Sequence, residues 1–512
     1  MPSGKGNPGL KAALAAGALL LASLPALAQS SNAAAAARHQ HALALVQSGD
    51  LAGAARELEA CLQIDASFAE AWNDLGVIRR KTGDLGGAIH AFEKAVAVRP
   101  GYMAGVYNLA LAYEANRDLA QAAARLREAV KLKPEMARPH LVLGRVLIAQ
   151  SHSAAAIPEL RKALQLDPAL PGAHLLLGTA LRQEGFITEA VTELRRAAGQ
   201  DPASAEAQQE LGLALFAGGA KTEAKSAFET AIQKNPAFAA ARVNLGQLYE
   251  ADGQNAAALE QYRQALRSGP TEEAAQLALA RLLVKTGEPA EARTVLEKAV
   301  ADHPVSAAVH FERGKLHETQ NDQPSAEREI RRAIALQPKT AEYYVELGRI
   351  LRALNHPAEA KAALQTALKI DPNSVEAHYA EAAIAKETDP AAARAEYAKV
   401  RELRQSEVNR DIALAAIRSG VRFAQQGDND AAIEQFRKAI SINPALGEAH
   451  FDLAGALMQK GDTEGAIASL REAIRLAPKW AEAHYQLGRA LEAANRRTEA
   501  QNEFRIAKSL QH

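Results

Sequence analysis

Cysteine is almost absent from this 512-residue chain, which contains one, Cys61. A single thiol cannot form an intramolecular disulfide, so packing alone must hold the fold together. Aromatic residues make up only 4% of the chain, and no runs of alternating β-branched residues are present to predict strands. Alanine, the best helix former, is abundant throughout. The composition therefore favours a core of closely packed short helices.

An excess of charge of either sign is also lacking. The 60 Lys and Arg residues balance the 60 Asp and Glu residues. A neutral surface of mixed sign gives no electrostatic reason to expect a nucleic acid or an anionic membrane as partner.

Only the first residues contain a long apolar run. Lys5 and Lys11 supply positive charge, residues 12–24 are apolar, and the small-residue pattern Ala-Leu-Ala ends at Ala28. This order predicts a secretory signal peptide over 1–28, followed by a short linker at 29–34. A retained anchor is the alternative, although the run is shorter than the roughly 20 residues that span a bilayer. After cleavage no membrane span is expected, and export without disulfides predicts a bacterial periplasmic or extracellular protein.

A period of 34 residues runs through the rest of the chain. It is marked by prolines at Pro100, Pro134, Pro168, Pro202, Pro236, Pro270, Pro304, Pro338 and Pro372, and again by Pro444 and Pro478. An alanine stands twelve residues before each of these prolines, and a Leu-Gly pair or a close variant recurs in the first half of most units. Small residues at fixed helical positions let two antiparallel helices approach closely, and the proline ends the second helix. The pattern predicts stacked helix-turn-helix units.

These units resemble tetratricopeptide repeats (TPRs). The resemblance is fullest in the unit 69–102, which carries Trp72, Leu75, Gly76, Ala88, Phe92, Ala95 and Pro100. Units begin at 35, 69, 103, 137, 171, 205, 239, 273, 307, 341, 375, 413, 447 and 481. The resemblance implies an all-α fold, a right-handed superhelical α-solenoid of about fourteen TPR units, and partners on its concave face.

One unit departs from the period. Residues 375–412 are longer than a regular unit, and 401–411 contain no helix breaker. We interpret 375–412 as a degenerate unit with a lengthened helix, between an array of ten units at 35–374 and one of three units at 413–512. It is either a functional hinge or a harmless drift of the period. In the terminal helix, Ile506 and Leu510 could support self-association, unless neighbouring polar residues act as a cap.

No motif for a nucleophile elbow, phosphate loop, dinucleotide site or zinc helix occurs, so neither an enzyme nor a cofactor is expected. Six histidines occupy the position of Trp72 in different units: His140, His174, His310, His378, His450 and His484. Because they lie one repeat apart, they are expected to pack between units and not to converge on a metal. Cys61 falls at the small-residue position of Ala95 and should be a buried structural thiol.

The resemblance implies that the first helix of each unit lines the concave face. The candidate peptide-binding residues on these helices are Asn73, Tyr107, Asn108, Arg145, Asn244, Arg281, Phe311, Lys315, Arg349, Tyr379, Phe451 and Tyr485. Aromatic rings can anchor peptides, Asn side chains can pair with peptide amides, and Arg can bind acidic groups. For each of them, a half-buried packing role or a solvated surface charge is the alternative.

Two known uses of such arrays match poorly. TPR co-chaperones that bind a C-terminal carboxylate need Lys and Asn at these positions, and the position after that of Trp72 contains no Lys. The repeat half of O-linked N-acetylglucosamine transferases carries an Asn ladder, which only Asn108 and Asn244 match, and no residues remain for a transferase domain. The expected function is a non-catalytic protein-interaction scaffold, for example in envelope or secretion assemblies. The alternative is an accessory subunit that recruits substrates for a separate glycosyltransferase or polysaccharide synthase.

Overall fold

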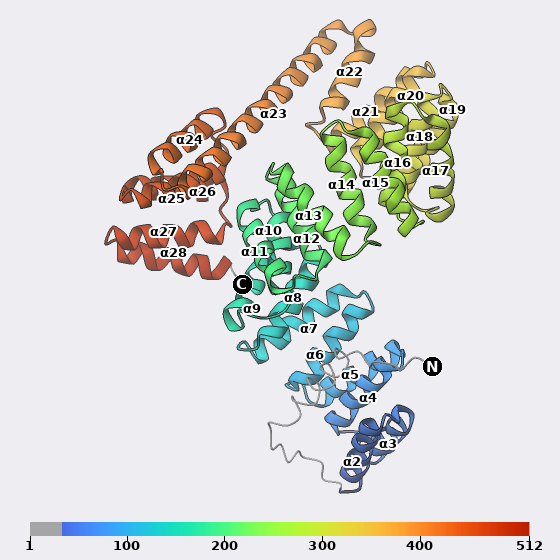
Figure 1. Ribbon diagram of the computed structural model, residues 1–512, viewed down its shortest axis with the longest axis vertical. Helices are drawn as coiled ribbons and strands as arrows, with labels where there is room; N and C mark the ends of the chain where they lie inside the picture. Colours follow the sequence, from blue (N-terminus) through green and yellow to red (C-terminus); the bar gives the residue numbers. More distant parts are fainter. Residues whose placement is uncertain (1–32, 511–512) are drawn as a thin grey trace. The chain divides into compact units, whose positions relative to one another are not determined.

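The computed structural model describes residues 33–510, so the predicted signal peptide (1–28) lies outside the described residues. Within this range the secondary structure consists of 27 helices without strands (Figure 1). The all-α repeat array predicted from the sequence is confirmed.

The chain divides after Ala180 into two compact units. The helices of the first unit are α2 (Ala33–Ser48), α3 (Leu51–Ile64), α4 (Ala69–Lys81), α5 (Leu85–Val98), α6 (Met103–Ala115), α7 (Leu119–Leu132), α8 (Ala137–Ala149) and α9 (Ser153–Leu166), and the division falls inside α10 (Ala173–Gln183).

The second unit contains the remaining helices. They are α11 (Ile187–Gln200), α12 (Ala205–Ala217), α13 (Lys221–Lys234), α14 (Ala239–Ala251), α15 (Asn255–Ser268), α16 (Glu273–Thr286), α17 (Pro289–Asp302), α18 (Ala307–Thr319), α19 (Gln323–Leu336), α20 (Ala341–Ala353), α21 (Pro357–Ile370), α22 (Val375–Thr388), α23 (Pro390–Gln425), α24 (Asn429–Ile442), α25 (Gly447–Gln459), α26 (Thr463–Leu476), α27 (Ala481–Ala493) and α28 (Arg497–Leu510).

Each repeat is a pair of helices whose ends are encoded locally, as α4 and α5 illustrate. Between them Gly83 adopts a left-handed conformation with φ of 87°, which glycine reaches at little cost. The next residue, Asp84, caps α5 by accepting a hydrogen bond from the amide of Gly87 at 2.8 Å. Helix α5 then ends at Val98, two residues before Pro100.

The two helices of a repeat meet through a glycine of the first helix and a large side chain of the second. In α12, Gly212 lies so close to the ring of Phe228 that an added Cβ would be 2.5 Å from Cε1 of that ring. The ring itself is fully buried, as are the repeated alanines Ala224 and Ala231 on the same helix. The small residues that define the period are therefore the residues that bring the helices together. Cys61 is fully buried, as its repeat position predicts.

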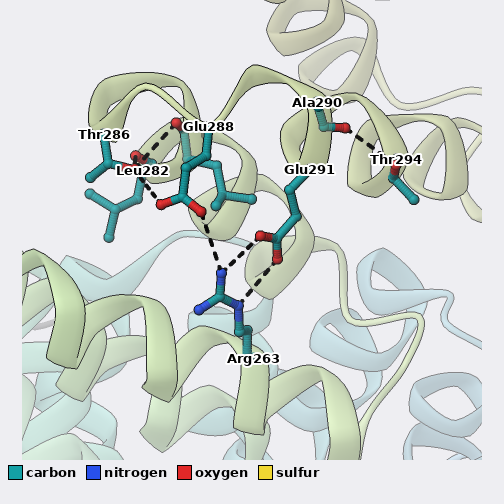
Figure 2. Close-up of polar contacts among 8 residues, drawn as sticks. Arg263, Leu282, Thr286, Glu288, Ala290, Glu291 and Thr294 are labelled. Atoms are coloured by element: carbon teal, nitrogen blue, oxygen red, sulfur yellow. Dashed lines mark hydrogen bonds and ion pairs between the residues drawn. The ribbon is translucent and has the colours of Figure 1, made fainter.

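Ion pairs connect the second helices of successive repeats. Arg263 of α15 binds Glu291 of α17 through two nitrogens, at 2.9 and 3.2 Å, and approaches Glu288 at 3.9 Å (Figure 2). The same spacing recurs in the pairs Arg195–Glu223, Arg331–Glu359 and Arg471–Glu499. These pairs lie at the protein surface, where Arg263 and Glu291 are half-buried, so each stabilises the stack only slightly.

Helix α23 differs from the others because it runs for 36 residues without a turn. Figure 1 shows it as one continuous helix. At a rise of about 1.5 Å per residue, its 36 residues span about 54 Å. Its first part packs as the second helix of the degenerate unit, and its last part packs with α24 as the first helix of the next unit. Neither Gly nor Pro occurs at 401–412, so nothing in the sequence interrupts the helix there.

Candidate functional site

The position occupied by Trp72, here called the donor position, attaches the first helix to the turn before it in most repeats; Val106 and Ala416 occupy it without a side-chain donor. Its side chain donates a hydrogen bond to the main-chain carbonyl six residues earlier, usually that of the repeat proline. The distances are 2.9 Å for Trp72 to Ala66, 3.0 Å for Tyr344 to Pro338, 3.1 Å for Gln276 to Pro270 and 3.2 Å for Arg242 to Pro236. Residues of very different shape therefore share one function, which is to satisfy a turn carbonyl.

Histidines at the donor position make a second contact. His310 places Nε2 3.2 Å from the carbonyl of Pro304 and Nδ1 2.8 Å from the carboxylate of Glu329. The same arrangement occurs at His140, His378 and His484. Both ring nitrogens face oxygen acceptors, so these histidines connect protein groups. Among residues 33–510, no group of three or more His, Cys, Asp or Glu side chains could hold a metal ion.

The asparagines of the first unit bind one another. Asn108 donates to Asn73 at 2.8 Å, and Asn73 donates to Asp74 at 3.2 Å. His39 approaches the other oxygen of Asp74 at 2.8 Å. Asn73 is 5% exposed, so its amide has little surface for a partner. In the second unit, Asn244 on α14 is half-buried.

The candidate aromatic residues divide into exposed and buried rings. Tyr379 is 52% and Tyr485 44% exposed, whereas Phe311 is 3% exposed against Tyr343, with ring centroids 4.8 Å apart. Phe451 is half-buried and stacks on Trp480. Burial of half-buried Tyr107 raises the pKa of its hydroxyl. Tyr379 and Tyr485 are therefore the candidate rings with most surface for a partner, while Phe311 has almost none.

Three cations occupy one equivalent position in three successive first helices. Arg281 lies on α16, Lys315 on α18 and Arg349 on α20; we call them the cation row. Their side chains are 54, 41 and 54% exposed. Arg145, at the equivalent position in the first unit, is engaged by Glu114 through two bonds of 2.8 Å.

Buried carboxylates lie beneath the cation row. Glu312 and Glu346 are each 6% exposed. Glu312 accepts a bond from Nε of Arg281 at 2.6 Å, and Glu346 accepts one from Arg349 at 3.2 Å. Burial, with a hydrogen bond to Glu318, raises the pKa of Glu346 to about 8. Burial thus disfavours the charged form of Glu346, and the exposed cations of the row lie above two carboxylates that are shielded from solvent.

Sequence reasoning missed two residues of this surface, Arg352 and Glu318. Arg352 is exposed and has no ion-pair partner among the described residues. It follows Arg349 by three residues and so lies on the same helical face. This i, i+3 spacing of two arginines is visible in the sequence and could have identified it. Glu318 pairs with Arg349 across two helices, and this contact depends on stacking that a single repeat does not reveal.

No helix within residues 33–510 combines the length and apolar character needed to cross a membrane.

Tetratricopeptide repeat models match most of the array. One matches residues 39–102, 107–171, 175–224, 221–273 and 417–481, a second matches 250–311 and 457–509, and a third matches 341–374. No curated protein matches the chain.

The solved structures that the chain matches are distant in sequence. The APC/C heterotetramer Cut9–Hcn1 is 16% identical, with 91% of this chain and 97% of that chain covered and a TM-score of 0.40. A tetratricopeptide repeat protein from Parabacteroides merdae is 17% identical, with 49% and 100% covered and a TM-score of 0.41. Yeast Tom70 is 18% identical, with 87% and 99% covered and a TM-score of 0.34. The family models span more than half of the chain, and on that ground the chain belongs to the tetratricopeptide repeat family.

Proposed function

We propose that this protein is a non-catalytic scaffold that binds other proteins or peptides on the side chains of its first helices, in assemblies of the cell envelope or of secretion. Family membership supports a role in protein–protein interaction. The observation that carries the proposal is the exposure of large or charged side chains at equivalent positions of these helices, namely Tyr379, Tyr485 and the cation row. Rings and guanidinium groups of this kind commonly dominate binding energy.

The test is capture of partners from an envelope extract by the full chain without residues 1–28. Tyr379→Ala and Tyr485→Ala should each reduce the captured set, because both rings are about half exposed. Leu132→Ala and Ile370→Ala are matched controls, since these apolar side chains are 36 and 37% exposed but lie on second helices. Identical capture by all four variants would contradict the proposed surface. A captured glycosyltransferase or polysaccharide synthase would instead favour the accessory-subunit role.

Export and self-association belong to the same proposal. The signal-like residues 1–28 support export, and mass spectrometry of the purified protein should show a chain that begins after Ala28. A chain that retains Lys5 would contradict cleavage. Half-buried Ile506 and Leu510 on α28 are the residues through which copies could associate. Light scattering that shows only monomers at high concentration would exclude that association.

A further inference from the structure

The cation row is a continuous surface because its three helices are linked side by side. Arg281 of α16 binds Glu312 of α18 at 2.6 Å. Arg349 of α20 approaches Glu318 of α18 at 3.5 Å. Phe311 of α18 and Tyr343 of α20 pack ring to ring beneath them. The three cations are therefore positioned by a single packed structure.

We infer that the first helices α16, α18 and α20 bind an extended acidic segment of a partner protein that carries a carboxylate at every third residue. The inference rests on the proposed scaffold function and specifies the chemistry of the partner. Its occupant is an acidic peptide because the surface exposes its cations and buries two of the neighbouring carboxylates, Glu312 and Glu346.

The charges around the row support this occupant. Five cations border the surface: Arg281, Lys285, Lys315, Arg349 and Arg352. Their carboxylate neighbours are Glu250, Glu312, Glu318 and Glu346. The five cations outnumber these four carboxylates, and burial raises the pKa of Glu346, which disfavours its charged form. The surface thus has an excess of positive charge within a chain whose overall charge is balanced.

The cations also keep donors free for a ligand. Arg281 donates to Glu312 through Nε, which leaves both terminal nitrogens available for a carboxylate. Lys315 lies 3.8 Å from Glu312 and 5.3 Å from the centre of the Phe311 ring. Arg352 has no carboxylate partner in the described chain and is exposed. A carboxylate can therefore approach each of these three groups without displacing an existing strong bond.

The spacing of the row sets the spacing of the ligand's acidic residues. We take the usual distance between the axes of packed helices, about 8–10 Å, as the step from one cation of the row to the next. An extended polyproline II chain has three residues per turn and rises about 3.1 Å per residue, so its i, i+3 and i+6 side chains lie on one side about 9 Å apart. Acidic residues at those three positions can therefore meet Arg281, Lys315 and Arg349 in turn.

The experiment measures binding of three fluorescein-labelled peptides to the full chain by fluorescence anisotropy. The spaced peptide is Glu-Ser-Ser-Glu-Ser-Ser-Glu, the clustered peptide has its three Glu residues adjacent followed by four Ser, and the reversed peptide carries Lys in place of Glu. We expect the spaced peptide to bind about tenfold more tightly than the clustered one at about 50 mM salt, and to weaken at about 500 mM because salt screens exposed charges. The reversed peptide should not bind measurably.

Two variants locate the binding on the row, and one variant is the control. The triple variant Arg281→Gln, Lys315→Gln, Arg349→Gln should lose at least tenfold in affinity for the spaced peptide. Arg352→Gln breaks no ion pair of the folded chain, so it tests the surface without endangering the fold, and should weaken binding several-fold. Arg489→Gln is the matched control, because Arg489 is exposed at the equivalent position of α27 with no cation beside it in the preceding repeats, and it should change nothing.

Several outcomes would overturn the inference: equal affinity for the spaced and clustered peptides, tighter binding of the reversed peptide, or unchanged binding by both row variants. These outcomes differ from failure of the scaffold function, which partner capture by the Tyr379 and Tyr485 variants tests separately. If those variants lose captured partners but no acidic peptide binds, the scaffold function stands and the acidic ligand is ruled out.

Discussion

The substitution Gly212→Ala tests whether the small residues of the repeat are required for helix contact. An added Cβ would lie 2.5 Å from Cε1 and 2.6 Å from Cδ1 of Phe228, closer than unstrained atoms allow, and the ring is fully buried. Overpacking of this kind costs about 1–3 kcal/mol. Alanine gains about 1 kcal/mol over glycine in a helix interior. We therefore expect a net loss of up to about 2 kcal/mol, although propensity alone predicts a gain.

The chain itself contains the compensating pair. Alanine replaces this glycine at Ala110, Ala280 and Ala454, and in each of these repeats the residue sixteen positions later is leucine. Glycine is present in every repeat where that later residue is aromatic, as in Gly212 and Phe228. The double variant Gly212→Ala, Phe228→Leu should therefore lose less stability than the two single variants do in sum, by roughly 0.5–3 kcal/mol. Phe228→Leu alone should cost about 1 kcal/mol through the space it leaves.

The assay must report on one repeat, because repeat arrays need not unfold in one step. Native hydrogen exchange, read by mass spectrometry on peptides from α12 and α13, gives the local free energy of opening in the full chain. Gly144→Ala on α8, read on peptides from α8 and α9, is the matched control. Its added Cβ would approach Leu160 as closely, but the chain pairs alanine with leucine in other repeats, so we expect it to be tolerated better than Gly212→Ala. The reasoning is refuted if Gly212→Ala stabilises α12, or if the two substitutions are simply additive.

Three further predictions concern polar contacts and use the same exchange assay. Burial raises the pKa of Glu346 from 4.5 in the unfolded chain to about 8 in the folded chain, so between these pH values the folded chain keeps a proton that the unfolded chain releases. The unsubstituted chain therefore loses stability as the pH rises across this window. Glu346→Gln does not titrate, so its stabilising effect on α20 should increase from about pH 4.5 to about pH 8. An equal effect at pH 4 and pH 8 would contradict that sign. His310→Ala should destabilise α18 by about 1–2 kcal/mol because it leaves a turn carbonyl and one carboxylate oxygen of Glu329 without a partner, while Arg313 still binds the other oxygen. A neutral result would show that water replaces the ring. Removing the half-buried surface pair with Arg263→Gln and Glu291→Gln should cost less than about 1 kcal/mol, and a larger loss would mean that these pairs hold the repeats together.

The repeated part of the fold could be read from the sequence because its signals are local. Asp84, Ala88 and Pro100 each determine a cap, a close helix contact or a helix end within their own repeat. The hydrogen bond from the donor position was only partly predictable. The sequence showed His, Trp and Tyr six residues after the turn position, but not that their shared polar edge meets the carbonyl there.

Exposure at the candidate site could not be predicted in the same way. Phe311 and Tyr379 occupy the same position of their repeats, yet one is 3% and the other 52% exposed. Phe311 is covered by Tyr343 from the next first helix, whereas the helix after α22 is the long α23, which places Tyr397 against one edge of the Tyr379 ring. The burial of such a side chain thus depends on the neighbouring repeat, whereas the 34-residue period describes the structure of a single repeat only.

These observations separate two kinds of position within each repeat. Glycine and alanine at the helix contact recur because each repeat must bring its helices equally close, so these positions carry no information about a partner. Positions on the exposed side of the first helices vary from repeat to repeat. A ligand that lies across several repeats can therefore recognise one array among others by side chains of the same kind at equivalent positions of successive repeats. Arg281, Lys315 and Arg349 form such a run, with one cation per repeat and exposed heads above buried carboxylates. Binding through the row should therefore decrease with each cation removed, since each repeat reads one acidic residue of the ligand.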